Sequence, residues 1–129
     1  MSKACIFLAD GFEEIEGLTV VDILRRAGVE IHMVSITGET KVTGSHGIEI
    51  KCDTCIGQEN FSEIELFVLP GGMPGTKNLG ACKALKELLT ASFEAGKKLA
   101  AICAAPSVLG DLGILKGKKA CCYPGFEEH

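Results

Sequence analysis

The sequence lacks an excess of positive charge and lacks any long basic segment. Its formal net charge at pH 7 is −4, and its lysines are scattered apart from Lys116, Lys118 and Lys119. Proteins that bind nucleic acid need a basic surface, because contacts with the phosphate backbone dominate their affinity. We therefore expect no nucleic-acid partner.

Long hydrophobic runs are also missing. The N-terminal segment carries one positive charge at Lys3 and a short apolar run that ends before Asp10, which is too short for a signal peptide or a membrane span. We therefore expect a cytoplasmic protein without a membrane partner.

No change in composition and no low-complexity stretch marks a linker between domains. The 129 residues are 47% hydrophobic, which is enough apolar material for one core. The sequence therefore predicts a single domain over residues 1–129.

The seven cysteines do not form the pattern of a disulfide framework or of a metal site. Their number is odd and no export signal precedes them, so we expect them to be reduced. Cys52 and Cys55 have the spacing of a zinc knuckle or a redox motif, but they lie in a predicted loop, and the only other close pair, Cys121 and Cys122, is poorly spaced for chelation. We predict neither a metal ion nor a cofactor.

Apolar runs alternate with amphipathic segments along the chain. The runs predict strands at residues 3–9, 29–36, 66–69 and 98–102, and a small hairpin over residues 41–43 and 48–50. The amphipathic segments predict helices at residues 13–27, 82–95 and 106–112. This alternation is typical of a mostly parallel sheet that is covered on both faces.

Three segments then meet at one edge of the predicted sheet. Residues 10–16 follow the first strand, residues 70–75 follow another, and Cys103 follows a third. Ligand sites in such sheets gather beyond the carboxyl ends of the strands, so this edge is the predicted functional site.

Cys103 stands where an apolar strand stops and a helix with Pro106 in its first turn begins. A strand-to-helix turn presents a side chain beside unpaired backbone N–H groups and the positive end of a helix dipole, which favours a thiolate. The alternative is that Cys103 is a small buried hydrophobic residue.

Glu16 lies one turn beyond the first strand and can reach the same edge. A carboxyl group buried beside a thiolate tends to stay protonated, and it could then move a proton during catalysis. Alternatively, Glu16 is solvated at the helix N-terminus, as we expect for Glu13 and Glu14. The backbone N–H groups of Gly71, Gly72 and Ala104 are candidate oxyanion donors, although the two glycines could equally serve only to form a tight turn.

Four motifs follow one another along the chain: LADGFEEIE at residues 8–16, RRAG at 25–28, VLPGGMPG at 68–75 and AICAAP at 101–106. In this order and spacing they resemble the DJ-1/ThiJ/PfpI superfamily over essentially the whole chain. The resemblance implies a flavodoxin-like (class I glutamine amidotransferase-like) three-layer α/β sandwich, usually a homodimer. It also implies that Cys103 is an easily oxidised nucleophile with Glu16 as its protonated partner, and that Gly71, Gly72 and Ala104 are the surrounding backbone donors.

The chain departs from the superfamily at several positions. Tyr123 stands where many members place a histidine, and Ala104 stands where the peptidase-like branch has one, which argues against a protease. His46 occupies a place where relatives present an arginine or another polar residue toward the site or the dimer edge; alternatively, it is an exposed turn histidine. The pattern also breaks off after a further strand and the turn at Pro124 and Gly125, so we expect a domain that is incomplete at its C-terminus or is completed by dimerisation.

The resemblance favours a glyoxalase or deglycase in which a Cys103 thiolate and protonated Glu16 act on methylglyoxal or on early glycation adducts. The first alternative is a redox-sensing stress protein or chaperone whose Cys103 is oxidised to sulfinic acid. The second is a role in thiazole or thiamine metabolism, which the family label alone suggests, because no phosphate-binding loop is present.

Overall fold

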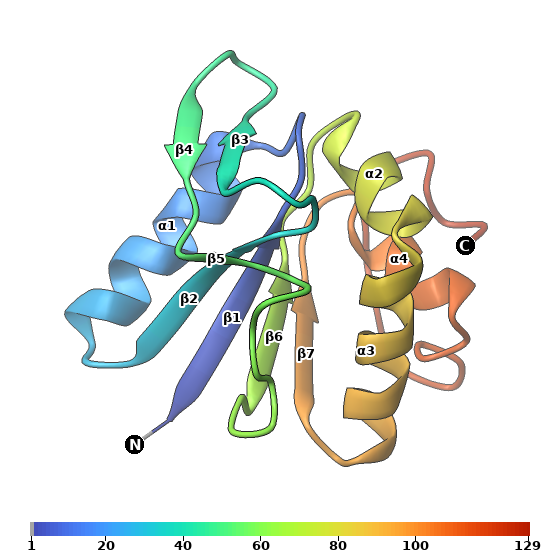
Figure 1. Ribbon diagram of the computed structural model, residues 1–129. Coiled ribbons are helices and arrows are strands. Elements are labelled where there is room, and N and C mark those ends of the chain that lie inside the picture. The colour runs from blue at the N-terminus through green and yellow to red at the C-terminus, as the bar shows by residue number, and fades with distance from the viewer. Residues whose placement is uncertain (1) are drawn as a thin grey trace.

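Five parallel strands form the central sheet, in the order β5-β2-β1-β6-β7 (Figure 1). The computed structural model describes residues 2–129. The strands of the sheet are β1 (Lys3–Leu8), β2 (Glu30–Ser35), β5 (Thr54–Cys55), β6 (Leu66–Leu69) and β7 (Lys98–Ala101). A separate antiparallel hairpin is formed by β3 (Lys41–Thr43) and β4 (Glu49–Lys51).

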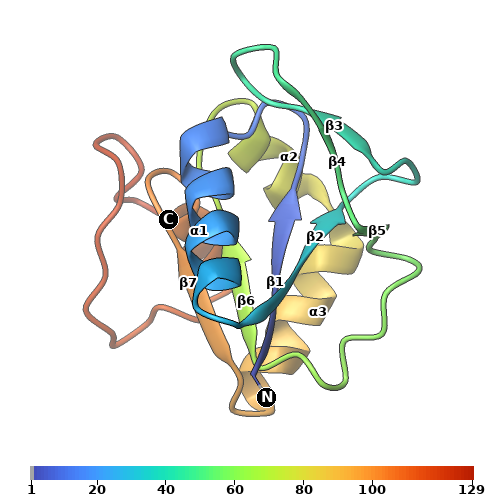
Figure 2. The same ribbon diagram turned by 90° about the vertical axis from the view of Figure 1, so that its left-hand side faces the viewer.

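Helices cover the sheet on both sides (Figure 2). Helix α1 (Glu14–Arg26) lies on one face, while α2 (Gly75–Ala81), α3 (Lys83–Glu94) and α4 (Pro106–Asp111) lie on the other. The predicted three-layer α/β sandwich with a mostly parallel sheet and a small hairpin is thereby confirmed. Within residues 2–129, no helix is both long enough and apolar enough to cross a lipid bilayer.

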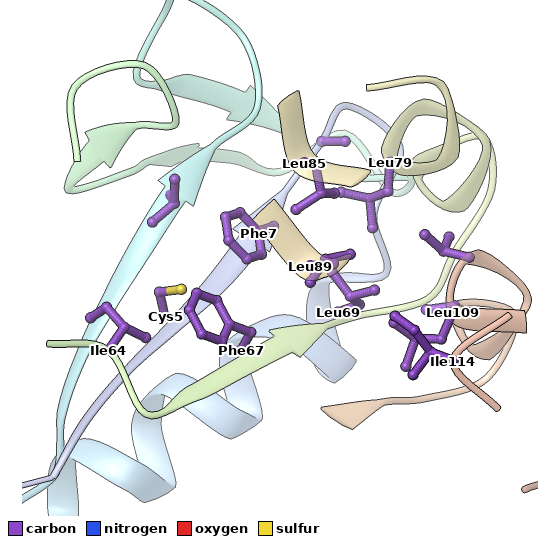
Figure 3. Packing of buried hydrophobic residues seen from close by; sticks show 14 residues of the cluster. Cys5, Phe7, Ile64, Phe67, Leu69, Leu79, Leu85, Leu89, Leu109 and Ile114 are labelled. Carbon is purple, nitrogen blue, oxygen red and sulfur yellow. The ribbon is translucent and has the colours of Figure 1, made fainter. Parts of the chain in front are cut away.

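The central strand β1 supplies side chains to both cores. Cys5 and Phe7 point toward α3, whereas Ala4, Ile6 and Leu8 point toward α1, and all five are fully or almost fully buried. This is the alternation of a parallel strand that is covered on both faces. On the α3 side the core contains the leucines of α2, α3 and α4 together with Phe7 and Phe67 (Figure 3).

The direction of the strand order changes at β1. The chain steps from β1 to β2 on one side of the sheet through α1, and later steps from β6 to β7 on the other side through α2 and α3. Right-handed crossovers in opposite directions place their helices on opposite faces, and they leave a crevice at the carboxyl ends of the strands where the order changes. The loops after β1, β6 and β7 lie at this end of the sheet (Figure 1).

The fold differs from the sequence prediction at three places. Residues 75–81 form helix α2, although their neighbouring glycines and prolines indicated only a turn, and the extended backbone at Cys82 (ψ 105°) separates α2 from α3. Thr54 and Cys55 form the short edge strand β5 in a segment predicted as a loop. The strand expected before Pro124 is absent, because residues 112–129 form turns and irregular chain.

Strand β7 is buried on one face only. Leu99 and Ala101 pack against the α3-side core, while Ala100, which pairs in register with the buried Val68, is exposed. Ile102, at the end of the strand, is 51% exposed. Over the described residues, the α1 side of this edge strand is therefore uncovered.

Candidate functional site

Cys103 has a left-handed backbone conformation directly between β7 and α4. Its φ of 63° makes it the one non-glycine residue of 2–129 with a positive φ. For an L-residue this conformation costs about 1–2 kcal/mol, and such strain is typical of functional sites. The predicted strand-to-helix turn is present, and it places Cβ of Cys103 beside Gly71.

Gly71 lies between Glu16 and Cys103. Its N–H donates a hydrogen bond of 2.9 Å to Oε1 of Glu16. A Cβ on Gly71 would lie 2.6 Å from that oxygen and 2.7 Å from Cβ of Cys103. The loops after β1, β6 and β7 therefore bring these three residues together, with space for glycine alone in the middle.

The backbone donors are not equivalent. Because the Gly71 N–H is bonded to Glu16, it is not available to an oxyanion in this arrangement. The Ala104 N–H lies within hydrogen-bonding reach of the Cys103 sulfur, and Gly72, with a φ of 95°, occupies a position where a side chain would overlap the backbone of Phe12 and Glu13. Gly72 thus remains a candidate donor, and the Ala104 N–H, which faces the sulfur, can serve an oxyanion once the sulfur has bonded to carbon.

The surroundings of Cys103 favour a thiol when Glu16 is ionised. Burial raises the pKa of the Cys103 thiol above its ordinary value, and the charge of Glu16 and its hydrogen bond raise this pKa further. The hydrogen bond from Ala104 acts in the opposite direction but is the smaller effect. The sequence predicted that the N-terminus of the following helix would favour a thiolate. That helix, α4, has only six residues, and the net effect of the surroundings of Cys103 is to raise its pKa.

Glu14 is buried, with 4% of its surface exposed, which corrects the expectation that it is solvated. Its carboxylate accepts hydrogen bonds from the backbone N–H groups of His46 (2.9 Å) and Ile48 (3.3 Å), and it lies 3.0 Å from Nδ1 of His46. Burial alone would raise the pKa of Glu14, but these hydrogen bonds outweigh it and lower the pKa to about 2. Glu14 therefore holds the β3-β4 hairpin to the start of α1.

His46 is exposed in the hairpin turn and contacts carboxylates rather than the cysteine. Its Nδ1 lies 3.0 Å from Glu14 and 3.6 Å from Glu13, and its hydrogen bond with Glu14 and the charge of Glu13 raise its pKa. Within residues 2–129, no hydrogen bond or ion pair joins His46 to Cys103. His46 is thus linked to the site only through its contacts with Glu13 and Glu14, which precede Glu16.

Further hydrogen bonds join the hairpin to the loop after β1. The Gly11 N–H donates to the carbonyl of Thr43 at 2.8 Å, and the Thr43 N–H donates to Oδ1 of Asp10 at 2.9 Å. The Ser45 N–H donates to the carbonyl of Phe12 at 2.8 Å. The segment that leads to Glu16 is therefore fixed from outside the sheet.

Tyr123 reaches the site through its backbone. Its N–H donates a 2.7 Å hydrogen bond to the carbonyl of Cys103, while the residue is 57% exposed and its ring packs edge-on against Phe126. The position predicted to replace a histidine is thus adjacent to the cysteine, but the phenol ring lies at the surface.

Glu13, Glu14 and His46 form the one group of three potential metal ligands found within residues 2–129, with their ligand atoms within 4.8 Å of one another. The hairpin already satisfies the Glu14 carboxylate through its hydrogen bonds. These hydrogen bonds account for the positions of Glu14 and His46 at the base of the hairpin.

Sequence reasoning missed Glu14 because its partners lie 31–34 residues away along the chain. The glutamate is one of three in a helix N-terminus, where solvated acidic residues are common. The local sequence carries no signal for the burial of this particular carboxylate.

Comparisons with known proteins agree over nearly the whole chain. The model of the DJ-1/PfpI family matches residues 2–129. Protein DJ-1 homolog B of Arabidopsis thaliana is 39% identical over 98% of this chain, which spans 29% of that protein's length. Deglycase PH1704 of Pyrococcus horikoshii is 32% identical over 98% of this chain and 75% of its own length. The structure of oxidized Toxoplasma gondii DJ-1 superposes with a TM-score of 0.94 at 36% identity, covering 99% of this chain and 70% of that one.

Proposed function

The chain belongs to the DJ-1/PfpI family, and we propose that it is a cysteine-dependent enzyme of the glyoxalase/deglycase type. Its substrates are methylglyoxal or early glycation adducts. The observation that supports this most directly is the position of Gly71 between Glu16 and Cys103. Its N–H donates a hydrogen bond to Glu16, and the absence of a side chain on Gly71 allows Glu16 and Cys103 to approach each other. A relative named as a deglycase, from Pyrococcus horikoshii, covers 98% of the chain.

The first step is addition of the Cys103 sulfur to the aldehyde carbon. The charge of Glu16 raises the pKa of Cys103, so in the proposed mechanism the thiolate forms when the thiol passes its proton to Glu16. Addition forms the S–C bond and turns the carbonyl oxygen into an alkoxide, which takes the proton from Glu16. The N–H groups of Gly72 and Ala104 stabilise the alkoxide as it develops.

The later steps use the same carboxylate. Glu16, now ionised, removes the proton from the carbon bound to sulfur and returns it to the adjacent carbon. The hydroxyl proton of the sulfur-bound carbon passes to the adjacent carbonyl oxygen, so that the first becomes a carbonyl and the second a hydroxyl. The resulting thioester is cleaved by water, which releases lactate and restores the cysteine. The sequence of steps consumes one water and needs no external oxidant or reductant. With a glycation adduct, the same thiolate attacks the carbinol carbon; the S–C bond forms, the C–N bond breaks, and the amine leaves with the proton from Glu16, which gives the same sulfur-bound intermediate.

Tyr123 limits the rate of this chemistry. Its ring is exposed and supplies no imidazole base beside Cys103, so Glu16 must carry each proton transfer. General acid–base catalysis by a second positioned group is commonly worth about 10²-fold or more. We therefore expect slow turnover.

Lactate formation from methylglyoxal tests the activity. Cys103→Ser and Glu16→Gln should each lower kcat/KM by about 10²-fold or more, because they remove the nucleophile and the proton carrier. Cys121→Ser is the matched control, since Cys121 is exposed and outside the Cys103–Gly71–Glu16 arrangement. Equal rates for the wild type and Cys103→Ser would refute the proposed activity.

A redox-responsive role is the second candidate. Cys103 is half-buried at a strained turn beside Glu16, and a related structure is that of an oxidized DJ-1. A protonated Glu16 can donate a hydrogen bond to a sulfinate at Cys103. Mass spectrometry after mild peroxide should then show oxidation of Cys103 ahead of the six other cysteines.

A further inference from the structure

A pair of adjacent cysteines lies beside the reactive one. Cys121 and Cys122 directly precede Tyr123, whose N–H donates a 2.7 Å hydrogen bond to the carbonyl of Cys103. The chemistry proposed for Cys103 uses neither of them. Two thiols at this position are candidates to form a disulfide with Cys103.

The hydrogen bond limits how far apart Cys103 and Cys122 can be. The Cα of Cys103 is two bonds from its carbonyl oxygen, and the Cα of Cys122 is two bonds from the nitrogen of Tyr123. With standard bond lengths and the 2.7 Å hydrogen bond, the two Cα atoms are at most about 7.5 Å apart. Disulfides span Cα distances of about 4.4–6.8 Å. The upper bound for Cys103 and Cys122 exceeds this range by less than about 1 Å, while Cys121 is one residue further along the chain.

The surroundings of Cys122 leave room for a shift of that size. Cys122 and Cys121 line a cavity of about 460 Å³ together with Pro106 and Ser107, which form the first turn of the helix that follows Cys103. Cys122 is half-buried, as is Cys103. Because residues 112–129 are turns and irregular chain, a local adjustment there breaks no strand or helix.

The other cysteines are less suitable partners. Cys5, Cys52 and Cys55 are buried in the sheet or beside it, and burial raises the pKa of Cys52 to about 12. Cys82 is half-buried at the junction of α2 and α3, where it packs on the core. Among the seven cysteines, Cys122 combines partial exposure with a backbone link to Cys103.

We propose that Cys122 is a resolving cysteine, which converts peroxide-oxidised Cys103 into a Cys103–Cys122 disulfide. The proposal rests on the reactive Cys103 of the proposed function, but not on any aldehyde substrate. It gives the site a reversible oxidised state in which the nucleophile is masked.

The reaction needs only a peroxide, ROOH. The Cys103 thiolate attacks one peroxide oxygen; the O–O bond breaks, ROH leaves after taking up a proton, and Cys103 becomes a sulfenic acid. The thiolate of Cys122 then attacks that sulfur; the S–S bond forms, the S–O bond breaks, and hydroxide leaves and is protonated to water. One peroxide gains two electrons, two thiols lose them, and an external dithiol reverses the change.

Disulfide formation competes with further oxidation of Cys103. A sulfenic acid without a nearby thiol reacts with a second peroxide and becomes a sulfinic acid, which ordinary thiols do not reduce. Cys122 therefore determines which of the two oxidised products accumulates. In wild-type protein the disulfide should predominate at low peroxide.

Peroxide titration followed by thiol alkylation and peptide mapping tests the proposal. The wild type should lose two hydrogen atoms in mass and yield a linked peptide that contains Cys103 and Cys122. Cys122→Ser should yield less than a tenth of the wild-type disulfide and should gain two oxygen atoms at Cys103 instead. Cys121→Ser is the matched control, and it should form the disulfide as the wild type does.

Two results would overturn the proposal. One is wild-type protein that gains two oxygens at Cys103 without a linked peptide; the other is loss of the link in Cys121→Ser rather than in Cys122→Ser. Lactate formation by reduced Cys122→Ser, measured in parallel, should stay within about twofold of the wild type. Absence of lactate formation in both proteins would refute the glyoxalase activity, but it would not affect the test of the disulfide, which depends only on the oxidation products.

Discussion

Gly71 and Glu16 are joined by a 2.9 Å hydrogen bond from the glycine N–H to the carboxylate Oε1, at a point where Gly71 has no room for a side chain. Cys103 lies on the other side of the same empty volume. The glycine thus sets both the orientation of the carboxylate and its approach to the sulfur.

Gly71→Ala should therefore lower the activity by about 10²-fold without unfolding the protein. The added methyl group would displace either Glu16 or Cys103, and small misplacements of reacting groups can cost about 10²-fold in rate. Lactate formation and the unfolding free energy should both be measured.

Gly80→Ala provides the matched control for this substitution. A Cβ on Gly80, within α2, would have Val108 at 3.9 Å as its nearest neighbour, and alanine is the better helix former by about 1 kcal/mol. This variant should keep its activity and become slightly more stable. Equal activities of the two variants would contradict the role given to Gly71.

Glu16→Gln should have opposite effects on two measurements. Glutamine keeps the shape of the side chain but removes the charge that, after burial, contributes most to raising the pKa of Cys103. The pKa of Cys103 should fall, so alkylation by iodoacetamide near neutral pH should be faster. Lactate formation should nevertheless decrease, because glutamine cannot carry the proton.

The pH profile of the alkylation rate shows whether Glu16 controls the pKa of Cys103. An unchanged profile in Glu16→Gln would mean that Glu16 does not control the thiol. Glu94→Gln, an exposed residue at the end of α3, should leave both the profile and the activity unchanged.

The predicted elements that are confirmed are those with strong local signals. The runs around Lys3–Leu8 and Leu66–Leu69 are continuously apolar and are buried on both faces, as parallel strands require. Helix α2 gave no such signal, because Gly75 and Pro74 are typical turn residues and the packing of α2 on the rest of the fold decides its conformation.

The residues of the site could be predicted from the sequence, but the hydrogen bonds between them could not. Parallel topology alone places the loops of Glu16, Gly71 and Cys103 at one edge. That Gly71 would donate to Glu16, and that Glu14 would be buried beneath the hairpin, depends on side-chain orientations across more than 30 residues of sequence. The substrate, the homodimer and the catalytic roles stay predictions.

Cys103→Gly should be more stable than Cys103→Ala. Both variants remove the sulfur, but only glycine adopts a φ of 63° without strain. The relief of about 1–2 kcal/mol exceeds the extra entropy that glycine loses on folding, so we expect a difference of about 1 kcal/mol. Chemical denaturation of the two proteins measures it, and a less stable glycine variant would argue against backbone strain at the nucleophile.

Docking of the β3-β4 hairpin on Glu14 should make the free energy of unfolding depend on pH in the acidic range. The pKa of Glu14 is about 2 in the fold against an ordinary value of 4.5, so its stabilising effect is fully present above about pH 4.5 and is lost as the pH falls toward 2. Glu14→Gln should flatten this part of the curve of unfolding free energy against pH. Glu94→Gln should retain the wild-type slope, and an identical slope in all three proteins would exclude the buried carboxylate as its source.

The hairpin also bears on the order in which the protein folds. The loop before Glu16 is fixed by residues that lie 32–33 positions away, through the hydrogen bonds of Thr43, Ser45 and His46 to Asp10, Phe12 and Glu14. Contacts of such sequence separation form only after the intervening chain has closed into a loop, which costs entropy in advance. The hydrogen bond from Gly71 to Glu16 spans 55 residues, and the pairing of β6 with β1 joins Ala4 to Leu66. A newly made chain therefore acquires the partner of its nucleophile only once β6 has joined the sheet.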